Sequence, residues 1–417
     1  MPSSVNVDVV IKKSETDGVI SAPPSKSYTH RAFFSAALSK KSAVKNPLIS
    51  EDTLATLMSC RKMGAEFVRK SGNLYFLGTE EVRAGYYNVM NSGTTLRILL
   101  SLLSLSPHSS ILDGDVSLRR RPNMELVVAL KSLGARIYGG DGFKAPLDVK
   151  GPIRTGIVQI SGKSSQFVTS LLFSLPLLEG DSTLTVSCIK SKPYIDITLD
   201  VLERSGVRIE VEGDSYYIHP SDFKLEEMEI PPDYSSMSYM IAAGLIAGKV
   251  VVDNAYESRQ GDRKFIDAAR EMGGKIVKKG EVLVAEKSEL DGIEFDAGDT
   301  PDLVPTIAIL GAVAKGETRI YNAEHLRIKE TDRIKTVVEN LRRLGIHAEE
   351  RKDGLVVKGG EIRSGVVDSF GDHRIAMAFS VLGLVREVTV KNAECVGISY
   401  PKFYDDLRKI GARVEVL

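Results

Sequence analysis

The sequence predicts an α/β protein of two similar lobes, each built from three compact βαβ-type subdomains. A phrase centred on a glycine recurs six times along the chain, and two Pro-Pro pairs divide the six copies equally. The length supports the same prediction, because 417 residues are more than one hydrophobic core usually organises.

The recurring phrase is a helical pattern that ends at a glycine, with an apolar residue three positions later that opens a strand-like run. The glycines, spaced 66 to 72 residues apart, are Gly64, Gly134, Gly206, Gly273, Gly345 and Gly411. Glycine can end a helix in the left-handed conformation, where a Cβ would be penalised. One copy would indicate only an ordinary helix-to-strand connection. Six copies indicate six repeats, and their period exceeds that of open solenoids, so each is expected to be a compact subdomain.

The Pro-Pro pairs predict where the chain passes between the lobes. Pro23-Pro24 and Pro231-Pro232 fit neither a helix interior nor a central strand. Three of the six glycines lie between the pairs and three lie after the second pair. We therefore expect one lobe over residues 23–231 and a second over residues 1–22 plus 232–417, with a cleft between them.

Composition excludes several classes of protein. The 55 basic and 55 acidic residues balance, whereas proteins that coat nucleic acid or anionic membranes usually show a basic excess. Cys60, Cys188 and Cys395 form no CxxC pair, so neither a zinc site nor a disulfide framework is expected. No apolar run reaches the ~18 to 20 residues of a membrane span, and the first residues lack a signal-peptide pattern. We expect a cytoplasmic protein without nucleic-acid or membrane partners.

Cationic side chains gather at predicted loops and helix starts, where backbone N–H groups add partial positive charge. They are Lys26, Arg31, Arg97, Arg121, Lys329, Arg333 and Arg374. In a chain of zero net charge, this placement favours a small, multiply anionic substrate over a polymer.

Each of these segments also has a plainer interpretation. Ser25 or Ser27 would cap a helix that includes Ala32–Leu38, and Asp302 would cap the apolar helix that follows it. The charged run from Lys329 to Arg333 is typical of a solvated helix face, although three cations would stabilise an ionised Glu330.

Nucleotide and metal motifs are missing. Five residues separate Gly156 from Gly162, whereas a P-loop has four between its glycines, so a P-loop kinase is disfavoured. No HExxH, DxDxDG or GxGxxG motif lies where it should, so we expect no metal and no cofactor.

Eight motifs occur in a fixed order from Lys26 to about Tyr404: SKSxxxR, NSGTTLR, RRRP, SSQF, SKPYIDITL, PDLVPT, KETDR and GDHR. Together they resemble the 5-enolpyruvylshikimate-3-phosphate synthase family of enolpyruvyl transferases. The resemblance implies an inside-out α/β barrel fold, in which each of two lobes has three βαβαββ repeats with the helices inside. It also implies a monomer that needs no cofactor.

The reaction implied by the resemblance belongs to aromatic amino acid (chorismate) biosynthesis. The enolpyruvyl group of phosphoenolpyruvate is transferred to the 5-hydroxyl of shikimate 3-phosphate, and phosphate is released. The transfer proceeds by addition and elimination through a tetrahedral intermediate. Because both substrates are anions, we expect their binding to close the cleft between two cationic lobes.

The resemblance also implies the site residues. The shikimate 3-phosphate ligands would be Lys26, Ser27, Arg31, Ser164, Ser165, Gln166, Ser191, Asp302 and Lys329. The phosphoenolpyruvate ligands would be Lys26, Gly93, Arg121, Gln166, Arg333 and Arg374. Asp302 would be the base that takes the 5-hydroxyl proton and Glu330 the proton donor, with Lys26 as a third catalytic residue. Arginine suits these anions because it binds carboxylate and phosphate bidentately.

Two positions depart from the family pattern. Ile398 stands where the family often carries a lysine, which leaves Lys402 as a possible substitute, and His325 stands where an asparagine is sometimes found. The small Gly93 permits, without establishing, binding of the inhibitor glyphosate.

Two other functions remain as alternatives. The sister enolpyruvyl transferases that act on UDP-N-acetylglucosamine usually carry a cysteine near the RRRP position, and Asp113–Arg121 has none. A catalytically inactive binding module on the same scaffold would be expected to lose Asp302, Glu330 or Lys26, and all three are present.

Overall fold

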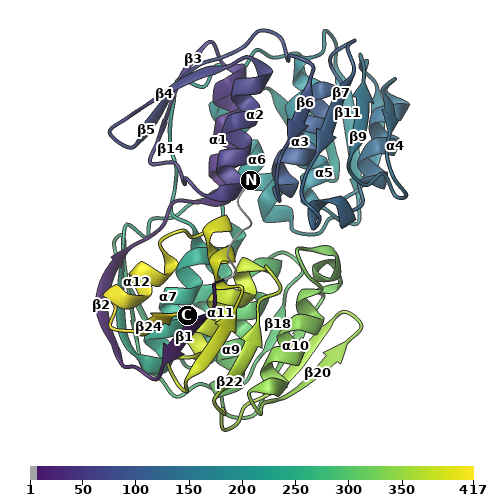
Figure 1. The fold of residues 1–417 in the computed structure, drawn as a ribbon. Helices are drawn as coiled ribbons and strands as arrows, with labels where there is room; N and C mark the ends of the chain where they lie inside the picture. The colour runs from purple at the N-terminus through teal and green to yellow at the C-terminus, as the bar shows by residue number, and fades with distance from the viewer. Residues whose placement is uncertain (1–6) are drawn as a thin grey trace. The chain divides into compact units, whose positions relative to one another are not determined.

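The chain folds into two compact units, seen in a computed structural model that describes residues 7–417 (Figure 1). The inserted unit comprises Pro24–Pro231, and the terminal unit comprises the described residues before Pro24 together with those after Pro231. These limits lie within one residue of the predicted lobe boundaries.

Within residues 7–417, the strands form six four-stranded sheets of one pattern. In each sheet, two parallel strands lie side by side, and two further strands continue the sheet in antiparallel pairs. Each sheet and its two main helices make one βαβαββ repeat, so each unit contains three repeats. The α/β class and the repeat number predicted from the sequence are confirmed.

The repeats of the inserted unit have the following bounds. The first contains β14 (Glu227–Glu229), α1 (Lys26–Leu38), β3 (Lys41–Lys45), α2 (Glu51–Met63), β4 (Glu66–Lys70) and β5 (Asn73–Leu77). The second contains β6 (Tyr86–Asn88), α3 (Gly93–Leu103), β7 (Ser110–Asp113), η1 (Leu118–Arg120), α4 (Met124–Ser132), β8 (Arg136–Tyr138) and β9 (Leu147–Lys150). The third contains β10 (Ile157–Ser161), α5 (Ser165–Ser174), η2 (Leu175–Leu177), β11 (Ser182–Ser187), α6 (Lys192–Arg204), β12 (Ile209–Glu212) and β13 (Ser215–Ile218).

The terminal unit repeats the same plan. Its first repeat contains β2 (Thr16–Ser21), α7 (Tyr234–Ala247), β15 (Gly248–Asp253), η3 (Gly261–Arg263), α8 (Lys264–Glu271), β16 (Lys275–Lys279) and β17 (Val282–Glu286). The second contains β18 (Glu294–Asp296), η4 (Pro301–Leu303), α9 (Val304–Val313), β19 (Glu317–Tyr321), η5 (Glu324–Ile328), α10 (Arg333–Arg343), β20 (His347–Arg351) and β21 (Gly354–Lys358). The third contains β22 (Gly365–Asp368), α11 (His373–Leu382), β23 (Val388–Lys391), η6 (Ala393–Ile398), α12 (Phe403–Lys409), β24 (Arg413–Val416) and β1 (Val9–Lys12).

The first helix of each repeat fills the interior of its unit, and the sheets lie outside (Figure 1). Every residue of α7 and of α11 is buried, and in α3 only Thr94 is not. A helix that is apolar on all sides is stable only when it is enclosed. Strand residues instead alternate between buried and exposed, as in β5, which is the pattern of a sheet with one solvated face. This arrangement is the inside-out barrel implied by the family resemblance.

All six glycines of the recurring phrase follow the second helix of a repeat and have positive φ, between 76° and 122°. The predicted left-handed helix ends are therefore confirmed. At Gly134 the backbone N–H donates to the Lys131 carbonyl at 3.0 Å, and the Ala135 N–H donates to the Leu130 carbonyl at 3.1 Å. These bonds satisfy carbonyls that the end of α4 would otherwise leave without donors.

Helix limits differ slightly from those expected. The helix expected to include Ala32–Leu38 begins at Lys26, because Ser25 caps it. Among the described residues, no helix combines the length and the apolar character that crossing a membrane requires.

Replacing Gly134 by alanine is expected to lower the free energy of unfolding by about 1 kcal/mol, because a Cβ is strained at φ 109°. The space there is open, since an added Cβ would meet only the Pro152 carbonyl oxygen, at 3.5 Å. Urea denaturation measures the change. Gly140→Ala is the matched control, at another exposed glycine whose φ lies outside the left-handed region. Equal stability of the two variants would contradict the helix-ending role of Gly134.

Candidate active site

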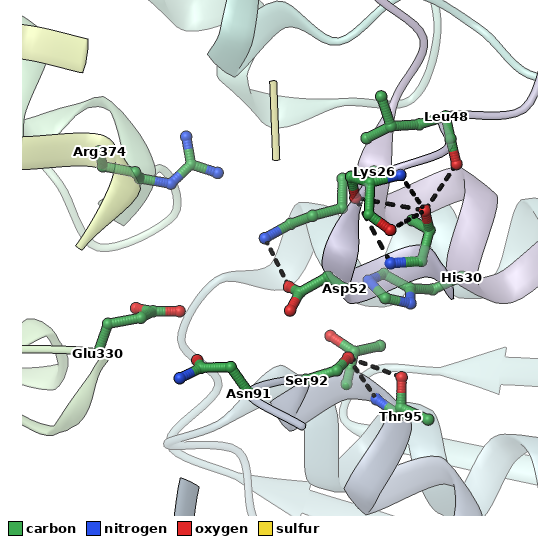
Figure 2. Close-up of polar contacts among 12 residues, drawn as sticks. Lys26, His30, Leu48, Asp52, Asn91, Ser92, Thr95, Glu330 and Arg374 are labelled. Carbon is green, nitrogen blue, oxygen red and sulfur yellow. Dashed lines mark hydrogen bonds and ion pairs between the residues drawn. The ribbon is translucent and has the colours of Figure 1, made fainter. Parts of the chain in front are cut away.

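The start of α1 places Lys26 beside an acidic partner. Ser25 caps the helix and accepts a hydrogen bond from the Tyr28 N–H at 3.4 Å, so Lys26 occupies the first helical position. Lys26 Nζ lies 3.1 Å from Asp52 Oδ2, and both side chains are mostly buried (Figure 2). The pair fixes the ammonium group at the helix N-terminus, where the helix dipole adds further positive potential.

Arg31 lies one helical turn further along α1 and is buried among neutral acceptors. Its guanidinium donates to Thr198 Oγ1 at 2.8 Å, to the Ser27 carbonyl at 2.8 Å, to the Tyr194 carbonyl at 3.0 Å and to Thr169 Oγ1 at 3.2 Å. Burial lowers the pKa of Arg31 to about 10, against smaller raising effects of Tyr194 and Tyr28, so the group remains charged near pH 7. A rigid buried cation without a carboxylate partner among these contacts suits an anionic ligand.

The start of α3 forms a second cationic corner around Gly93. An added Cβ at Gly93 would lie 2.7 Å from Arg97 Nη1, 3.2 Å from Arg121 Nη1 and 3.4 Å from Gln166 Oε1. Arg97 donates to Gln166 Oε1, and Gln166 Nε2 donates to Thr94 Oγ1 at 3.1 Å. The absence of a side chain at Gly93 is therefore what lets these polar groups converge on one point of the backbone.

Of the three consecutive arginines, Arg121 is the buried one, and its Nη1 lies at this corner. Arg121 Nη2 donates to Asn91 Oδ1 at 2.7 Å and to Ser117 Oγ at 3.3 Å. Arg119 instead pairs with Asp113 through two hydrogen bonds of 2.9 and 2.6 Å, and its side chain is half exposed. The structure thus separates one buried arginine from an exposed neighbour.

The remaining predicted residues of the inserted unit lie at the starts of α5 and α6. Ser164 is at the N-cap position of α5, with Ser165 and Gln166 in its first turn. Ser191 precedes α6 in the left-handed conformation, at φ 55°, and is buried. Their N–H and hydroxyl groups can donate to an anion without adding charge.

In the terminal unit, Asp302 binds two arginines. Its Oδ1 accepts from Arg333 Nη1 at 2.9 Å, and its Oδ2 accepts from Arg374 Nη2 at 2.6 Å. The interpretation of Asp302 as a simple N-cap is wrong. Pro301 opens the 3-10 turn η4, so Asp302 lies inside that turn rather than in front of a helix, and its carboxylate turns to the guanidinium groups.

Arg333 holds three carboxylates together. Besides Asp302, its Nη2 donates to Glu330 Oε2 at 2.6 Å and its Nε donates to Asp372 Oδ2 at 2.7 Å. Burial by itself would lower the pKa of Arg333, but Asp372, Glu330 and Asp302 outweigh it and raise the pKa above its ordinary value. The guanidinium is therefore a permanent charge that fixes the positions of Asp302 and Glu330 relative to each other.

The KETDR segment does not form a solvated helix face, and that interpretation is wrong. Lys329 to Asp332 connect η5 to α10, all partly buried, and the helix begins only at Arg333. Asp332 caps α10 by accepting from the Lys335 N–H at 3.1 Å, and it also pairs with Arg327 at 2.9 Å. Asp332 therefore stabilises local structure, and Glu330 and Arg333 belong to the arginine cluster. Lys329 and Glu330 lie in the loop that precedes α10.

The positions that depart from the family pattern differ in burial. Ile398 is buried in the apolar core, so it supplies no cation. Lys402 is exposed and precedes α12. His325 lies half-buried in η5.

Several residues that shape the site were not among the predicted ligands. Asp52 pairs with Lys26 from a different helix, and Asp372 holds Arg333 from 39 residues away. Arg97 stood among the candidate cations but was not assigned a ligand role, although it contacts Gln166. Arg97 and Asp372 both stand inside quoted motifs, which was a usable signal, whereas no local pattern marked Asp52.

Comparison with known proteins decides the family. The family model for EPSP synthase (3-phosphoshikimate 1-carboxyvinyltransferase) matches residues 10–407. The chain belongs to the EPSP synthase family. A 3-phosphoshikimate 1-carboxyvinyltransferase of Archaeoglobus fulgidus is 57% identical over 98% of this chain and 99% of its own. One from Methanocella arvoryzae is 43% identical over 97% of this chain and 99% of its own.

The fold of this chain matches that of two solved structures. The EPSP synthase of Acinetobacter baumannii superposes with a TM-score of 0.83 at 26% identity and covers 99% of this chain and all of its own. The enolpyruvyl transferase NikO of Streptomyces tendae shares the fold, with a TM-score of 0.81 at 19% identity over 99% of both chains.

The arginine cluster predicts a stability effect at Asp372, which is fully buried and accepts from both Arg333 and Thr331. Asp372→Ala is expected to lower the free energy of unfolding by about 3 to 5 kcal/mol, because it leaves part of a buried charge without its partner. Urea denaturation measures the loss. Asp405→Ala is the control, since Asp405 pairs with Arg408 on the exposed surface and should change stability by less than about 1 kcal/mol. Similar losses in the two variants would show that the cluster contributes no more than a surface pair.

Proposed function

We propose that the residues of both units bind the same two substrates and transfer the enolpyruvyl group of phosphoenolpyruvate to the 5-hydroxyl of shikimate 3-phosphate. Membership of the EPSP synthase family carries the reaction itself. The assignment of individual residues is our proposal, supported by the geometry within each unit.

The observation that carries this assignment is the shared contact of Asp302 and Glu330 with Arg333. Asp302 also contacts Arg374, so a base and a proton donor lie beside two guanidinium groups. Addition of an alcohol to an enol double bond needs one group to take a proton and another to give one. Phosphoenolpyruvate supplies a phosphate and a carboxylate for the cations to bind.

The inserted unit would supply most of the ligands for shikimate 3-phosphate. Arg31 and the donors at the starts of α1, α5 and α6 suit the phosphate and hydroxyl groups of this substrate: Ser27, Ser164, Ser165, Gln166 and Ser191. From the terminal unit, Asp302 and Lys329 would contact the same molecule. Lys26 would contact both substrates. Gly93, Gln166 and Arg121 would bind phosphoenolpyruvate together with Arg333 and Arg374.

In the first step, Asp302 takes the proton of the 5-hydroxyl while the hydroxyl oxygen bonds to C2 of phosphoenolpyruvate. C3 receives a proton from Glu330, which gives the tetrahedral intermediate. In the second step, the C2–O bond to phosphate breaks and the ionised Glu330 takes a proton back from C3, which restores the double bond as an enolpyruvyl ether. A carboxylate oxygen has two lone pairs, so an arginine contact to each oxygen of Asp302 is compatible with the transfer.

Proton donation by Glu330 requires its neutral form, whereas its contact with Arg333 favours the ionised form. Bound phosphoenolpyruvate adds negative charge beside these groups. Since like charges disfavour ionisation, substrate binding would help to protonate Glu330. Lys26 and the arginines would stabilise charge that develops on the departing phosphate.

Phosphate release from phosphoenolpyruvate tests the substrate assignment. It is measured with shikimate 3-phosphate and, in parallel, with UDP-N-acetylglucosamine. Release only with shikimate 3-phosphate is the expected result. Release only with the nucleotide sugar would overturn the acceptor assignment, and release with neither by a folded protein would support the binding-module alternative.

We also propose that the protein acts as a monomer in the cytoplasm and needs no cofactor. Light scattering after size exclusion should then give a mass near 45.5 kDa, and dialysis against a chelator should leave the activity unchanged.

Asp302→Asn is expected to reduce turnover on the order of 100-fold, because asparagine cannot take the hydroxyl proton. The dissociation constant of shikimate 3-phosphate, measured by calorimetry, should change by less than about fivefold, since asparagine retains an acceptor. Asp332→Asn is the control, because Asp332 caps α10 in the same unit and asparagine caps equally well. Wild-type turnover of Asp302→Asn would remove Asp302 from the mechanism.

Arg121→Ala is expected to raise the KM for phosphoenolpyruvate by about tenfold or more, through loss of a charge-assisted contact. The KM for shikimate 3-phosphate should rise far less. Arg119→Ala serves as the matched control, because Arg119 pairs with Asp113 and is half exposed. An equal rise for both substrates in Arg121→Ala would argue against the assignment.

A further inference from the structure

A buried hydrogen-bond network joins three helices of the inserted unit. His30 Nδ1 lies 2.6 Å from Thr56 Oγ1, Thr56 Oγ1 lies 2.5 Å from Thr95 Oγ1, and Thr95 Oγ1 lies 2.6 Å from Ser92 Oγ. All four side chains are at most 1% exposed. We call this set the His30 network. It contains none of the residues assigned above to a substrate.

The network begins beside Lys26. His30 lies one helical turn after Lys26 in α1, and Thr56 lies one turn after Asp52 in α2. Two polar contacts therefore connect α1 and α2 one turn apart, Lys26 with Asp52 and His30 with Thr56. The second contact continues to α3 through Thr95.

The network ends at the backbone next to Gly93. Ser92 is the N-cap of α3 and accepts from the Thr95 N–H at 3.3 Å, as Figure 2 shows. The turn held in this way carries Gly93 and Thr94, and Arg97 follows on the next turn. Thr94 and Arg97 both contact Gln166. A shift of the first turn of α3 would therefore move the whole corner around Gly93.

Burial of the His30 imidazole at this position costs free energy. Burial, together with the charges of Lys26 and Arg31, lowers the pKa of His30 well below its ordinary value, so the ring is neutral near pH 7. Within residues 7–417, its buried Nε2 has no hydrogen-bond partner. An apolar side chain would avoid that cost, so the contribution of His30 lies in the bond made by Nδ1.

We propose that the His30 network is a positioning device, which holds the first turn of α3 in register with Lys26. It rests on the proposed function, because Gly93 is there assigned to phosphoenolpyruvate and not to shikimate 3-phosphate. Arg31 keeps four hydrogen bonds of its own that do not involve the network. Loss of the network should therefore affect phosphoenolpyruvate far more than shikimate 3-phosphate.

Substitution at Thr56 separates the network from general packing. Thr56→Val keeps the shape and removes the hydroxyl, whereas Thr56→Ser keeps the hydroxyl. Thr56→Val is expected to raise the KM for phosphoenolpyruvate about tenfold, because small misplacements of binding groups weaken binding strongly. The calorimetric dissociation constant of shikimate 3-phosphate should stay within about twofold of the wild-type value. Thr56→Ser should have a KM for phosphoenolpyruvate close to that of the wild type.

Ser35→Ala is the matched control. Ser35 is a buried hydroxyl on α1 that bonds Ser205 Oγ at 2.8 Å, away from the network. The Ser35→Ala substitution should lower the melting temperature without changing the KM for phosphoenolpyruvate. Wild-type KM in Thr56→Val, or equal losses for both substrates, would overturn the proposal.

Variants at His30 provide a second route if Thr56→Val does not fold. The amide of asparagine can take the place of Nδ1, so His30→Asn should retain a near wild-type KM, whereas His30→Leu should raise it as Thr56→Val does. The double variant His30→Leu with Thr56→Val should be little worse than either single variant, because the two residues share one network. Additive effects of the two substitutions would contradict the network.

Hydrogen exchange without substrates separates failure of this inference from failure of the proposed function. Amides of Thr95 and Leu96 should exchange faster in Thr56→Val than in the wild type or in Ser35→Ala. Unchanged exchange would overturn the positioning role even if the enzyme is active. Faster exchange in a protein that releases no phosphate with shikimate 3-phosphate would instead overturn only the proposed function.

Discussion

Enclosure of the helices constrains everything else in this structure. Helices such as α7 and α11 are buried along their whole length, so their sides cannot present polar groups to a ligand without a large cost. Their ends can present such groups at a lower cost. The proposed ligands accordingly gather at helix starts: Lys26 at α1, Gly93 at α3, Gln166 at α5, Arg333 at α10 and Arg374 at α11. Helix N-termini also carry partial positive charge, so the same constraint that restricts polar groups to these places makes the places suited to anions.

The charged groups at these ends are held by two different means. Arg31 is surrounded by neutral acceptors and keeps its full charge for a ligand, whereas Arg333 is surrounded by three carboxylates. Such buried pairs add little net stability, because desolvation offsets much of their attraction. Their value in this site is geometric. Arg333 fixes the relative positions of Asp302 and Glu330, and Asp302 in turn fixes Arg374.

What the sequence predicted well was local or periodic. The six glycines could be read because ending a helix depends on one residue and its neighbours, and all six have positive φ. The role of Asp302 could not be read locally, because its partners lie 31 and 72 residues further along the chain. Local capping preferences therefore favoured the wrong interpretation, and only the ordered motifs pointed to chemistry. Asp52 was not predicted for the same reason, since nothing near it in the sequence indicates that it pairs with Lys26.

The order of strands in the last sheet bears on how the protein is made. Strand β1, the first strand of the described residues, lies between β23 and β24, which are the last two. The inserted unit is complete once β14 has emerged from the ribosome and paired with β3. The terminal unit closes only when β23 and β24 exist, so β1 stays unpaired until then, whereas β2 can pair earlier, once β15 has emerged. Any factor that shields nascent strands would therefore act chiefly on β1 and β2, while the inserted unit folds ahead of them.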